Sequence, residues 1–341
     1  MNKLKSVCTA LAVALSVTSA SAGTTINIQA TASAGDWVQN FYEEWADKYN
    51  AMTGPDGTKI EVMPFQAVVP YRETLDAVAN GILGGDMSAI SYFTGRDQLF
   101  SIMGDLIAGY DTVDQVQTFC QYGGGKEFMQ KVYDETMPGK MHVVGCAAFS
   151  REALVSTTPI NGLEDLKGLK IRSPEGLASE VFKRAGAAPV ALPYSEVFTS
   201  LEKGVVDAAD ASSYINNSAA GLYKIAKYPL YPGIHSMATF QLVLSKDAWD
   251  SMSEADQVAL DVWFTAMFVS LARASDLEDK RIAAEDTAAG DITIINWAQE
   301  DRDGFRAIAS EAWEAVAAKS ELATEALNTH KAFMKTIGLL D

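Results

Sequence analysis

The sequence predicts an α/β fold of two lobes, with a cleft between the lobes and one long helix that spans both. Strand and helix patterns alternate over residues 25–92 and again over residues 169–208, and the mixed stretch of residues 123–156 lies between them. Such alternation is typical of parallel-type sheets covered by helices. Residues 254–289 contain neither glycine nor proline, which predicts a single continuous helix near the C-terminus.

The N-terminus has the order of a secretory signal peptide. Lys3 and Lys5 precede the uncharged, mainly apolar residues 7–17, and the small residues 20–22 follow. Because the apolar stretch is too short to cross a hydrocarbon core of about 30 Å, we expect a cleavable signal rather than a membrane anchor. We place cleavage after Ala22 and expect a soluble, exported mature protein.

In the first lobe we expect strands and helices to alternate along the chain. Phe41, Trp45 and Tyr49 recur at helical spacing, which indicates the apolar face of a helix. The predicted elements are, in chain order, a strand over residues 25–30, a helix over 37–50, a strand over 60–63, a helix over 71–79 that ends at Gly81, and a buried strand over 87–92.

The second lobe repeats this alternation. Ser195 is a candidate N-cap for a helix that Gly204 would end, because a serine hydroxyl can accept a hydrogen bond from the first helical turn. The predicted elements are, in chain order, a strand over residues 169–172, a helix over 177–185, a strand over 188–192, a helix over 196–202 and a strand over 205–208.

The C-terminal part is predicted to be helical. Ser253 and Asp256 resemble a capping box at the start of the helix over residues 254–289. At 1.5 Å per residue this helix is on the order of 50 Å long, which exceeds the width of one lobe. Residues 301–337 indicate further amphipathic helix. We therefore assign residues 23–148 and about 235–265 to lobe I, 149–234 to lobe II, and 254–341 to the long helix and to C-terminal helices that pack on both lobes.

The composition argues against nucleic acid and anionic lipid as partners. The 341-residue chain carries a formal net charge of −17, and so acidic a surface repels polyanions. Cys120 and Cys146 remain after removal of the signal, in a compartment where disulfides can form. They form either a bridge or two separate buried thiols, and their spacing alone does not decide between the two.

Few residues could carry catalysis. The chain has three histidines, and it contains no H-E-x-x-H, C-x-x-C or G-x-S-x-G motif. The glycines of residues 123–125 resemble a phosphate loop, but the upstream glycine is missing and Glu127 replaces the magnesium-binding Ser or Thr. We therefore expect neither an enzyme nor a cofactor. The alternative, an exported enzyme on a two-lobed fold, would require a nucleophile–base pair or a metal.

Several motifs resemble, in family order, the solute-binding proteins of TRAP (tripartite ATP-independent periplasmic) transporters. Two later motifs resemble the branch that includes 2-oxo acid receptors. The first set is D-L-K-G-L-K-I-R at residues 165–172, A-G-A at 185–187, L-P-Y-S-E at 192–196 and L-E-K-G-V-V-D at 201–207, and the later pair is G-L-Y-K-I-A-K-Y at 221–228 and P-G-x-H at 232–235.

The resemblance implies a periplasmic-binding-protein type fold whose two lobes close over a small organic acid. The ligand would be a monocarboxylate, with 2-oxo and 2-hydroxy acids as candidates. A periplasmic receptor of this kind hands its ligand to a membrane permease, and we expect it to be a monomer. A receptor of an ATP-driven importer is the alternative within the same class, but a long helix across both lobes favours the TRAP family.

The resemblance also identifies candidate ligand contacts. Its carboxylate-binding arginine falls on Arg172, and an arginine at a strand end can present two parallel N–H donors to a carboxylate in a cleft. A salt bridge between the lobes is the alternative role for this residue. Arg151 corresponds to a second ligand-facing arginine of many relatives, with a surface salt bridge as its alternative. Asp210 falls where the family has an acidic residue beside the ligand.

In the oxo-acid branch, a metal accompanies the acidic residue beside the ligand. Here Ala211, Ser236 and Met237 depart from that pattern, and a hard cation requires several oxygen ligands. We therefore expect no metal, and we expect the Asp210 carboxylate to accept a hydrogen bond instead.

Aromatic residues near strand ends could complete the site. Trp37 follows the first strand, and Tyr92 and Phe93 end the third, so all three could reach the cleft. A place in the hydrophobic core is the alternative for each. His235 is a candidate polar contact, with a structural role in its turn as the alternative.

Overall fold

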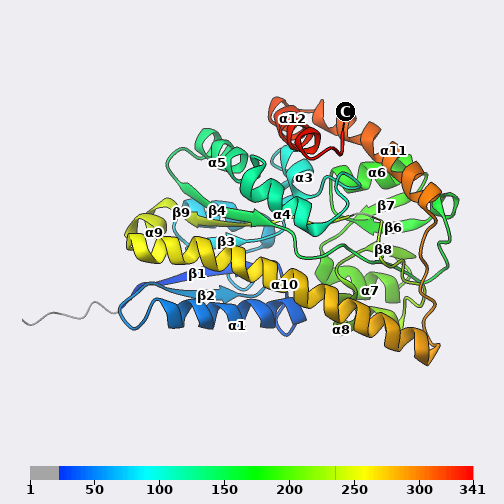
Figure 1. The fold of residues 1–341 in the computed structure, drawn as a ribbon, viewed down its shortest axis with the longest axis horizontal. Helices are drawn as coiled ribbons and strands as arrows, with labels where there is room; N and C mark the ends of the chain where they lie inside the picture. Colours follow the sequence, from blue (N-terminus) through cyan, green and yellow to red (C-terminus); the bar gives the residue numbers. More distant parts are fainter. Residues whose placement is uncertain (1–22, 235, 341) are drawn as a thin grey trace, which may run out of the picture.

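Two β-sheets form the centres of two lobes (Figure 1). The computed structural model describes residues 23–234 and 236–340, so the predicted signal peptide and His235 lie outside the described residues. The five-stranded sheet has the order β2-β1-β3-β9-β4 and the four-stranded sheet the order β5-β8-β6-β7. This arrangement confirms the predicted two-lobed α/β fold. The residue limits of the lobes stay a prediction.

The first sheet is mixed. Strands β1 (Thr25–Ala30), β2 (Lys59–Met63) and β3 (Gly85–Met87) are parallel, whereas β9 (Phe240–Ser245) is antiparallel to both β3 and β4 (Met141–Ala147). The chain therefore returns to this lobe for β9 after building the second sheet. The helices that surround it are α1 (Trp37–Met52), α2 (Thr74–Ala79), α3 (Leu99–Gly104), α4 (Val113–Tyr122), α5 (Gly125–Thr136) and α9 (Lys246–Ser251).

The second sheet brings the end of its inner strand β6 to the cleft. Strand β6 (Lys170–Ser173) is parallel to β7 (Ala188–Ala191) and to β8 (Ala208–Asp210), and β5 (Leu154–Ser156) is antiparallel to β8. Because parallel strands end at the same sheet edge, the last residues of β6 and β8 lie close together. The helices of this lobe are α6 (Leu177–Arg184), α7 (Val197–Glu202) and α8 (Tyr214–Ala219).

The long helix α10 (Glu254–Ala289) has the predicted bounds and lies across both lobes (Figure 1). Ser253 caps it by accepting a hydrogen bond from the Asp256 N–H at 3.1 Å. On the first lobe, Trp263 Nε1 donates to the Trp45 carbonyl at 2.6 Å. On the second lobe, Asp279 Oδ1 accepts from the Ile215 N–H at 2.7 Å. The helix is thus attached to each lobe by a buried polar contact as well as by apolar packing.

Part of α10 is apolar enough, by composition alone, to resemble a membrane span, with a mean hydropathy of 1.3 over 18 residues. Its large apolar side chains nevertheless belong to the core of the first lobe, where Trp263, Phe264 and Phe268 are buried against β1, β2 and α1 residues. The core packing of this stripe accounts for part of the hydropathy of the helix, whereas Val258, Val262 and Leu277 on the same helix are exposed.

The C-terminal region contains two helices rather than one continuous stretch. Helix α11 (Gln299–Ala317) ends shortly before Ser320, whose hydroxyl caps α12 (Glu321–Thr336) by accepting from the Ala323 N–H at 2.9 Å. Helix α11 packs on α6 of the second lobe, and α12 packs on α3 and α5 of the first.

Two predicted strands and one predicted cap are wrong. Strand β3 ends at Met87, and residues 90–93 form a 3-10 turn whose Ile90 N–H donates to the Thr239 carbonyl at 3.0 Å. The Val205 N–H donates a hydrogen bond to the Ser200 carbonyl at the end of α7, so it does not pair with a strand. Strand β8 begins only at Ala208. Ser195 lies inside a 3-10 turn that continues into α7, and it makes no cap.

A disulfide joins Cys120 of α4 to Cys146 of β4, with their Cα atoms 5.4 Å apart. The two cysteines therefore form a bridge and are not two separate buried thiols. It fastens a helix to the edge strand of the first sheet.

Candidate functional site: the cleft between the lobes

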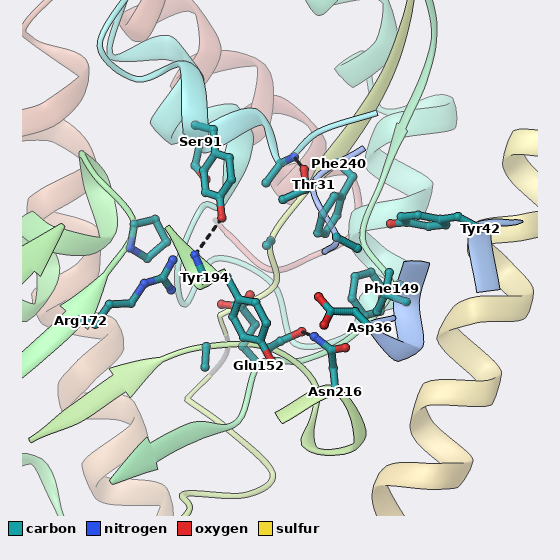
Figure 2. Close-up of a pocket in the computed structure, with 18 residues that line it drawn as sticks. Thr31, Asp36, Tyr42, Ser91, Phe149, Glu152, Arg172, Tyr194, Asn216 and Phe240 are labelled. Carbon is teal, nitrogen blue, oxygen red and sulfur yellow. Dashed lines mark hydrogen bonds between the residues drawn. The ribbon is translucent and has the colours of Figure 1, made fainter. Parts of the chain in front are cut away.

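A cavity of about 70 Å³ lies between the lobes and is lined by both of them (Figure 2). Apolar side chains form much of its wall. The first lobe contributes Thr31, Ser91 and Phe240, and the second contributes Arg172, Tyr194 and Asn216. A volume of this size admits a ligand of a few non-hydrogen atoms.

Arg172 is fixed at the end of β6, where it is 2% exposed. Its Nε–H donates to the Leu192 carbonyl at 2.8 Å, and its Nη1 donates to the Asp210 carbonyl. A guanidinium has five N–H donors, and two of them are used in this way. Within residues 23–234 and 236–340 no further acceptor lies within hydrogen-bonding distance, so the remaining donors are available to a ligand in the cavity.

Three buried carboxyl groups converge beside Arg172 on the hydroxyl of Ser236. The Ser236 Oγ atom lies 2.6 Å from Asp105 Oδ2, 3.0 Å from Glu152 Oε2 and 3.3 Å from Asp210 Oδ2. Glu152 also lines the cavity. In the sequence, Ser236 stands out only as a departure from a metal-binding pattern, and no local pattern marks Asp105 or Glu152.

Burial controls the ionisation of this carboxyl cluster, which we define as Asp105, Glu152 and Asp210. Burial raises the pKa of Asp105 to about 7, and the Ser236 hydroxyl lowers it in part. Burial also raises the pKa of Asp210 to about 6, although the nearby charge of Arg172 acts to lower it. The pKa of Glu152 is raised well above its usual range, first by burial and then by its two carboxyl neighbours.

Two polar contacts cross the cleft near its mouth. The Tyr92 hydroxyl oxygen accepts a hydrogen bond from the Tyr194 N–H at 3.1 Å (Figure 2). Arg72 Nη2 lies 2.9 Å from Glu175 Oε2. Tyr92 therefore reaches the cleft from the first lobe, where it contacts the second lobe directly.

The other predicted contacts lie elsewhere. Trp37 packs on Phe41 with ring centroids 5.9 Å apart, and its neighbour Asp36 lines the cavity instead. Phe93 is 2% exposed in the core, against Phe100. The role of His235 as a ligand contact stays a prediction.

Arg151 lies on the opposite side of its segment from the cleft cavity. It lines a second cavity beside α10, and its Nη2 donates to the Asp111 carbonyl. The adjacent residue, Glu152, lines the cleft cavity. Neighbouring side chains on the segment between β4 and β5 thus line different cavities, and the role of Arg151 as a ligand contact stays a prediction. Asp210 contacts Arg172 through its main-chain carbonyl and Ser236 through its carboxyl group.

The two described histidines lie outside the cleft cavity. His142 stacks on Trp249 with ring centroids 3.8 Å apart, and His330 Nδ1 lies 2.8 Å from the Tyr110 hydroxyl in the core. Neither one pairs with a nucleophile in the cleft.

A cleft between two α/β lobes, with a buried arginine facing a small cavity, defines a solute-binding receptor. The chain belongs to the bacterial extracellular solute-binding protein family 7, whose sequence model matches residues 28–320. A TRAP periplasmic solute-binding protein of Rhodobacter sphaeroides, solved in an apo open form, is 36% identical, with a TM-score of 0.76 and coverage of 92% of this chain and 99% of that one.

Two relatives whose names state a ligand are less similar in sequence. A monocarboxylate 2-oxoacid-binding periplasmic protein of Nostoc sp. is 26% identical over 82% of this chain and 76% of its own length. A TRAP periplasmic solute-binding protein of Colwellia psychrerythraea, solved with calcium and pyruvate, is 23% identical, with a TM-score of 0.78 and coverage of 93% and 96%.

The cleft residues of this chain do not fit a resident cation. The Ser236 hydroxyl occupies the position on which the three carboxyl groups converge. Among the described residues, no group of three His, Cys, Asp or Glu side chains is arranged to hold a metal ion. Calcium requires six to eight oxygen ligands. Binding without a metal stays a prediction.

Proposed function

We propose that this protein is the periplasmic receptor of a TRAP transporter for a small monocarboxylate, with 2-oxo acids as the first class to test. The single observation that carries the proposal is Arg172, a buried guanidinium held by two carbonyls with its remaining donors open to the cavity. The Nostoc relative, named as a binder of monocarboxylate 2-oxo acids, supports the same ligand class. The closed receptor would deliver its ligand to a membrane permease.

The size and polarity of the cavity support a ligand with one carboxylate. At about 70 Å³, the cavity offers little room beyond a carboxylate and a short chain. Phe149 and Phe240 line it with apolar surface. A second carboxylate would face the carboxyl cluster without a second arginine, since Arg151 lies in another cavity.

A thermal-shift screen tests this proposal directly. The panel would contain pyruvate, 2-oxobutyrate, lactate, malonate and ectoine, each in large excess over the mature protein. A ligand at 100 times its dissociation constant adds about 2.7 kcal/mol of apparent stability, which is readily visible as a rise in Tm. We expect the monocarboxylate anions pyruvate, 2-oxobutyrate and lactate to raise the Tm. We expect no effect from malonate, which is a dicarboxylate, or from ectoine, which is a larger cyclic zwitterion. A rise with ectoine alone, or with none of the acids, would refute the proposal.

A further inference from the structure

The carboxyl cluster brings together groups from three parts of the chain. Asp105 follows α3, Glu152 lies between β4 and β5, and Asp210 ends β8. Their exposed fractions are 8%, 8% and 1%. Glu152 connects the cluster to the ligand cavity, because it lines that cavity together with Arg172.

The number of hydrogens limits how the cluster can be arranged. A serine hydroxyl has one hydrogen to donate and two lone pairs with which to accept. Three carboxyl oxygens lie within 3.3 Å of Ser236 Oγ. The hydroxyl can donate to only one of them, so the other two contacts are hydrogen bonds only where a carboxyl group supplies its own proton. The geometry thus favours two neutral carboxyl groups and one carboxylate.

The charges around the carboxyl cluster also favour two neutral carboxyl groups and one carboxylate. The titratable groups around Glu152 are Asp105, Asp210, Arg172 and the tyrosines Tyr92 and Tyr194, with Asp36 lining the same cavity, and of these only Arg172 is cationic. One buried guanidinium can balance one carboxylate, and further unpaired charges would cost several kcal/mol each. The raised pKa values of the three acids, caused mainly by burial, agree with this count.

An unused acceptor provides a further observation. Asp210 Oδ1 is buried and has no hydrogen-bond partner in the described part of the chain. A buried acceptor of this kind is costly unless a proton or a donor reaches it. Glu152 is a neighbouring acid that can supply one, since its carboxyl group and that of Asp210 both lie within 3.3 Å of Ser236 Oγ.

We propose that Asp105, Glu152 and Asp210 are joined through Ser236 by shared protons, in place of a bridging cation, and that Glu152 presents a neutral carboxyl group to the bound ligand. This neutral acid donates a hydrogen bond to the ligand where an ionised acid would repel its carboxylate. Glu152 is therefore a specificity-determining residue for ligands that carry an acceptor oxygen near the carboxylate. The ligand part of this inference rests on the proposed function, whereas the protonation of the cluster does not.

The proposal predicts proton uptake when the ligand binds. A bound carboxylate neutralises Arg172, which otherwise lowers the pKa of Glu152 and Asp210. Their pKa values are therefore higher in the complex than in the free receptor. Affinity should consequently rise as the pH falls from about 8 to about 6, because the complex binds more protons than the free protein. A cation bridge predicts the reverse, because protons compete with a metal for carboxylate ligands.

The first test measures the protonation of the carboxyl cluster in the absence of ligand. Infrared spectra of the ligand-free mature protein at about pH 7 should show the carbonyl band of buried neutral carboxylic acids, since an ordinary exposed acid is ionised there. That band should weaken in Glu152→Gln and remain unchanged in the control Glu164→Gln, whose side chain is 80% exposed. The absence of a band from Glu152 would overturn the proposal, whatever the outcome of the ligand experiments.

The second test uses pyruvate as the probe. Calorimetric titrations after dialysis against EDTA, at about pH 6 and about pH 8 and in buffers of different ionisation enthalpy, should show net proton uptake and tighter binding at the lower pH. Glu152→Ala should weaken binding about tenfold, and Glu152→Gln should restore most of the loss with a smaller pH dependence, because Asp210 still takes up protons. Binding that weakens at lower pH and requires added calcium would contradict the proposal. Failure of pyruvate to bind at all would count against the proposed function, and the infrared result would still decide the state of the cluster.

Discussion

The orientation of Arg172 depends on main-chain groups from two other segments. The Leu192 carbonyl follows β7 and the Asp210 carbonyl ends β8, and both accept hydrogen bonds from the guanidinium. Burying a charged group is costly unless its donors are satisfied, and these two carbonyls satisfy part of the requirement. A ligand carboxylate would accept hydrogen bonds from the remaining N–H groups of Arg172. In the free receptor, protein groups accept from only two of these donors.

Replacement of Arg172 should therefore strongly reduce the affinity for the ligand. Removal of one partner of a desolvated charge pair costs about 2 to 5 kcal/mol, so Arg172→Ala should weaken ligand binding by at least about thirtyfold in calorimetry. Arg172→Lys should not restore it, because a single ammonium cannot reproduce the flat pair of donors. The control is Arg184→Ala, which removes an arginine that pairs with Glu180 on the surface of α6. Affinity that is nearly unchanged in Arg172→Ala would show that the anchor lies elsewhere.

At the residue scale, the place of Arg172 in the cleft could be predicted from the sequence, whereas the groups around it could not; its role as the ligand anchor stays a prediction. Arg172 could be predicted because it ends a motif of eight consecutive residues at a strand end. The carboxyl cluster could not, because its members come from separate parts of the chain and none of them belongs to a local pattern. Glu152 was missed by one position, since the choice between it and Arg151 depends on the local direction of each side chain.

At the scale of elements, predictions succeeded where the sequence marks both the start and the end of an element. Helix α10 was predicted to its end residues because Ser253 begins it, Gly290 ends it and no breaker lies between. The third strand was predicted too far along the chain because most of residues 87–92 are buried, although regular strand pairing ends at Met87 and only an isolated bridge joins Ala89 to Phe240. Burial alone cannot distinguish a short strand from a buried turn, and here the strand lies just before, at Gly85–Met87.

The disulfide between α4 and β4 should stabilise the first lobe. Cross-linking residues that are 26 positions apart restricts the unfolded chain and contributes about 3 kcal/mol in the chain-entropy account. The double variant Cys120→Ser/Cys146→Ser should lose about this much free energy of unfolding in urea denaturation. The same loss should follow when the wild-type protein is reduced. Equal midpoints for the oxidised and reduced wild-type protein would show that the bridge does not stabilise the fold.

At the scale of the whole molecule, buried acids give the receptor an unusual dependence of stability on pH. Burial raises the pKa of Asp105 and Asp279 to about 7, and that of Asp86 and Asp210 to about 6. In the unfolded chain these groups titrate near about 3.9. The folded state therefore binds more protons than the unfolded state up to about pH 7, so its stability falls as the pH rises through this range.

The two described histidines act in the opposite direction at lower pH. Burial lowers the pKa of His330 to about 3 and that of His142 to about 4, so below about pH 6.5 the unfolded chain binds their protons and the folded chain does not. The two histidines offset only part of the effect of the four acids, so the ligand-free receptor should lose Tm as the pH rises from about 6 to about 8. Asp105→Asn should reduce that loss. A Tm that rises steadily from pH 6 to pH 8 would be incompatible with these buried acids.

The receptor function of the whole molecule depends on where the ligand lies between the lobes. The most direct measurement is a crystal structure of the mature protein with the monocarboxylate that gives the largest thermal shift. We predict its carboxylate in the cleft cavity, accepting two hydrogen bonds from the Arg172 guanidinium, with Glu152 beside the ligand and no cation between them. A ligand bound in the cavity beside α10 at Arg151, or held in the cleft without contact to Arg172, would contradict this account of the site.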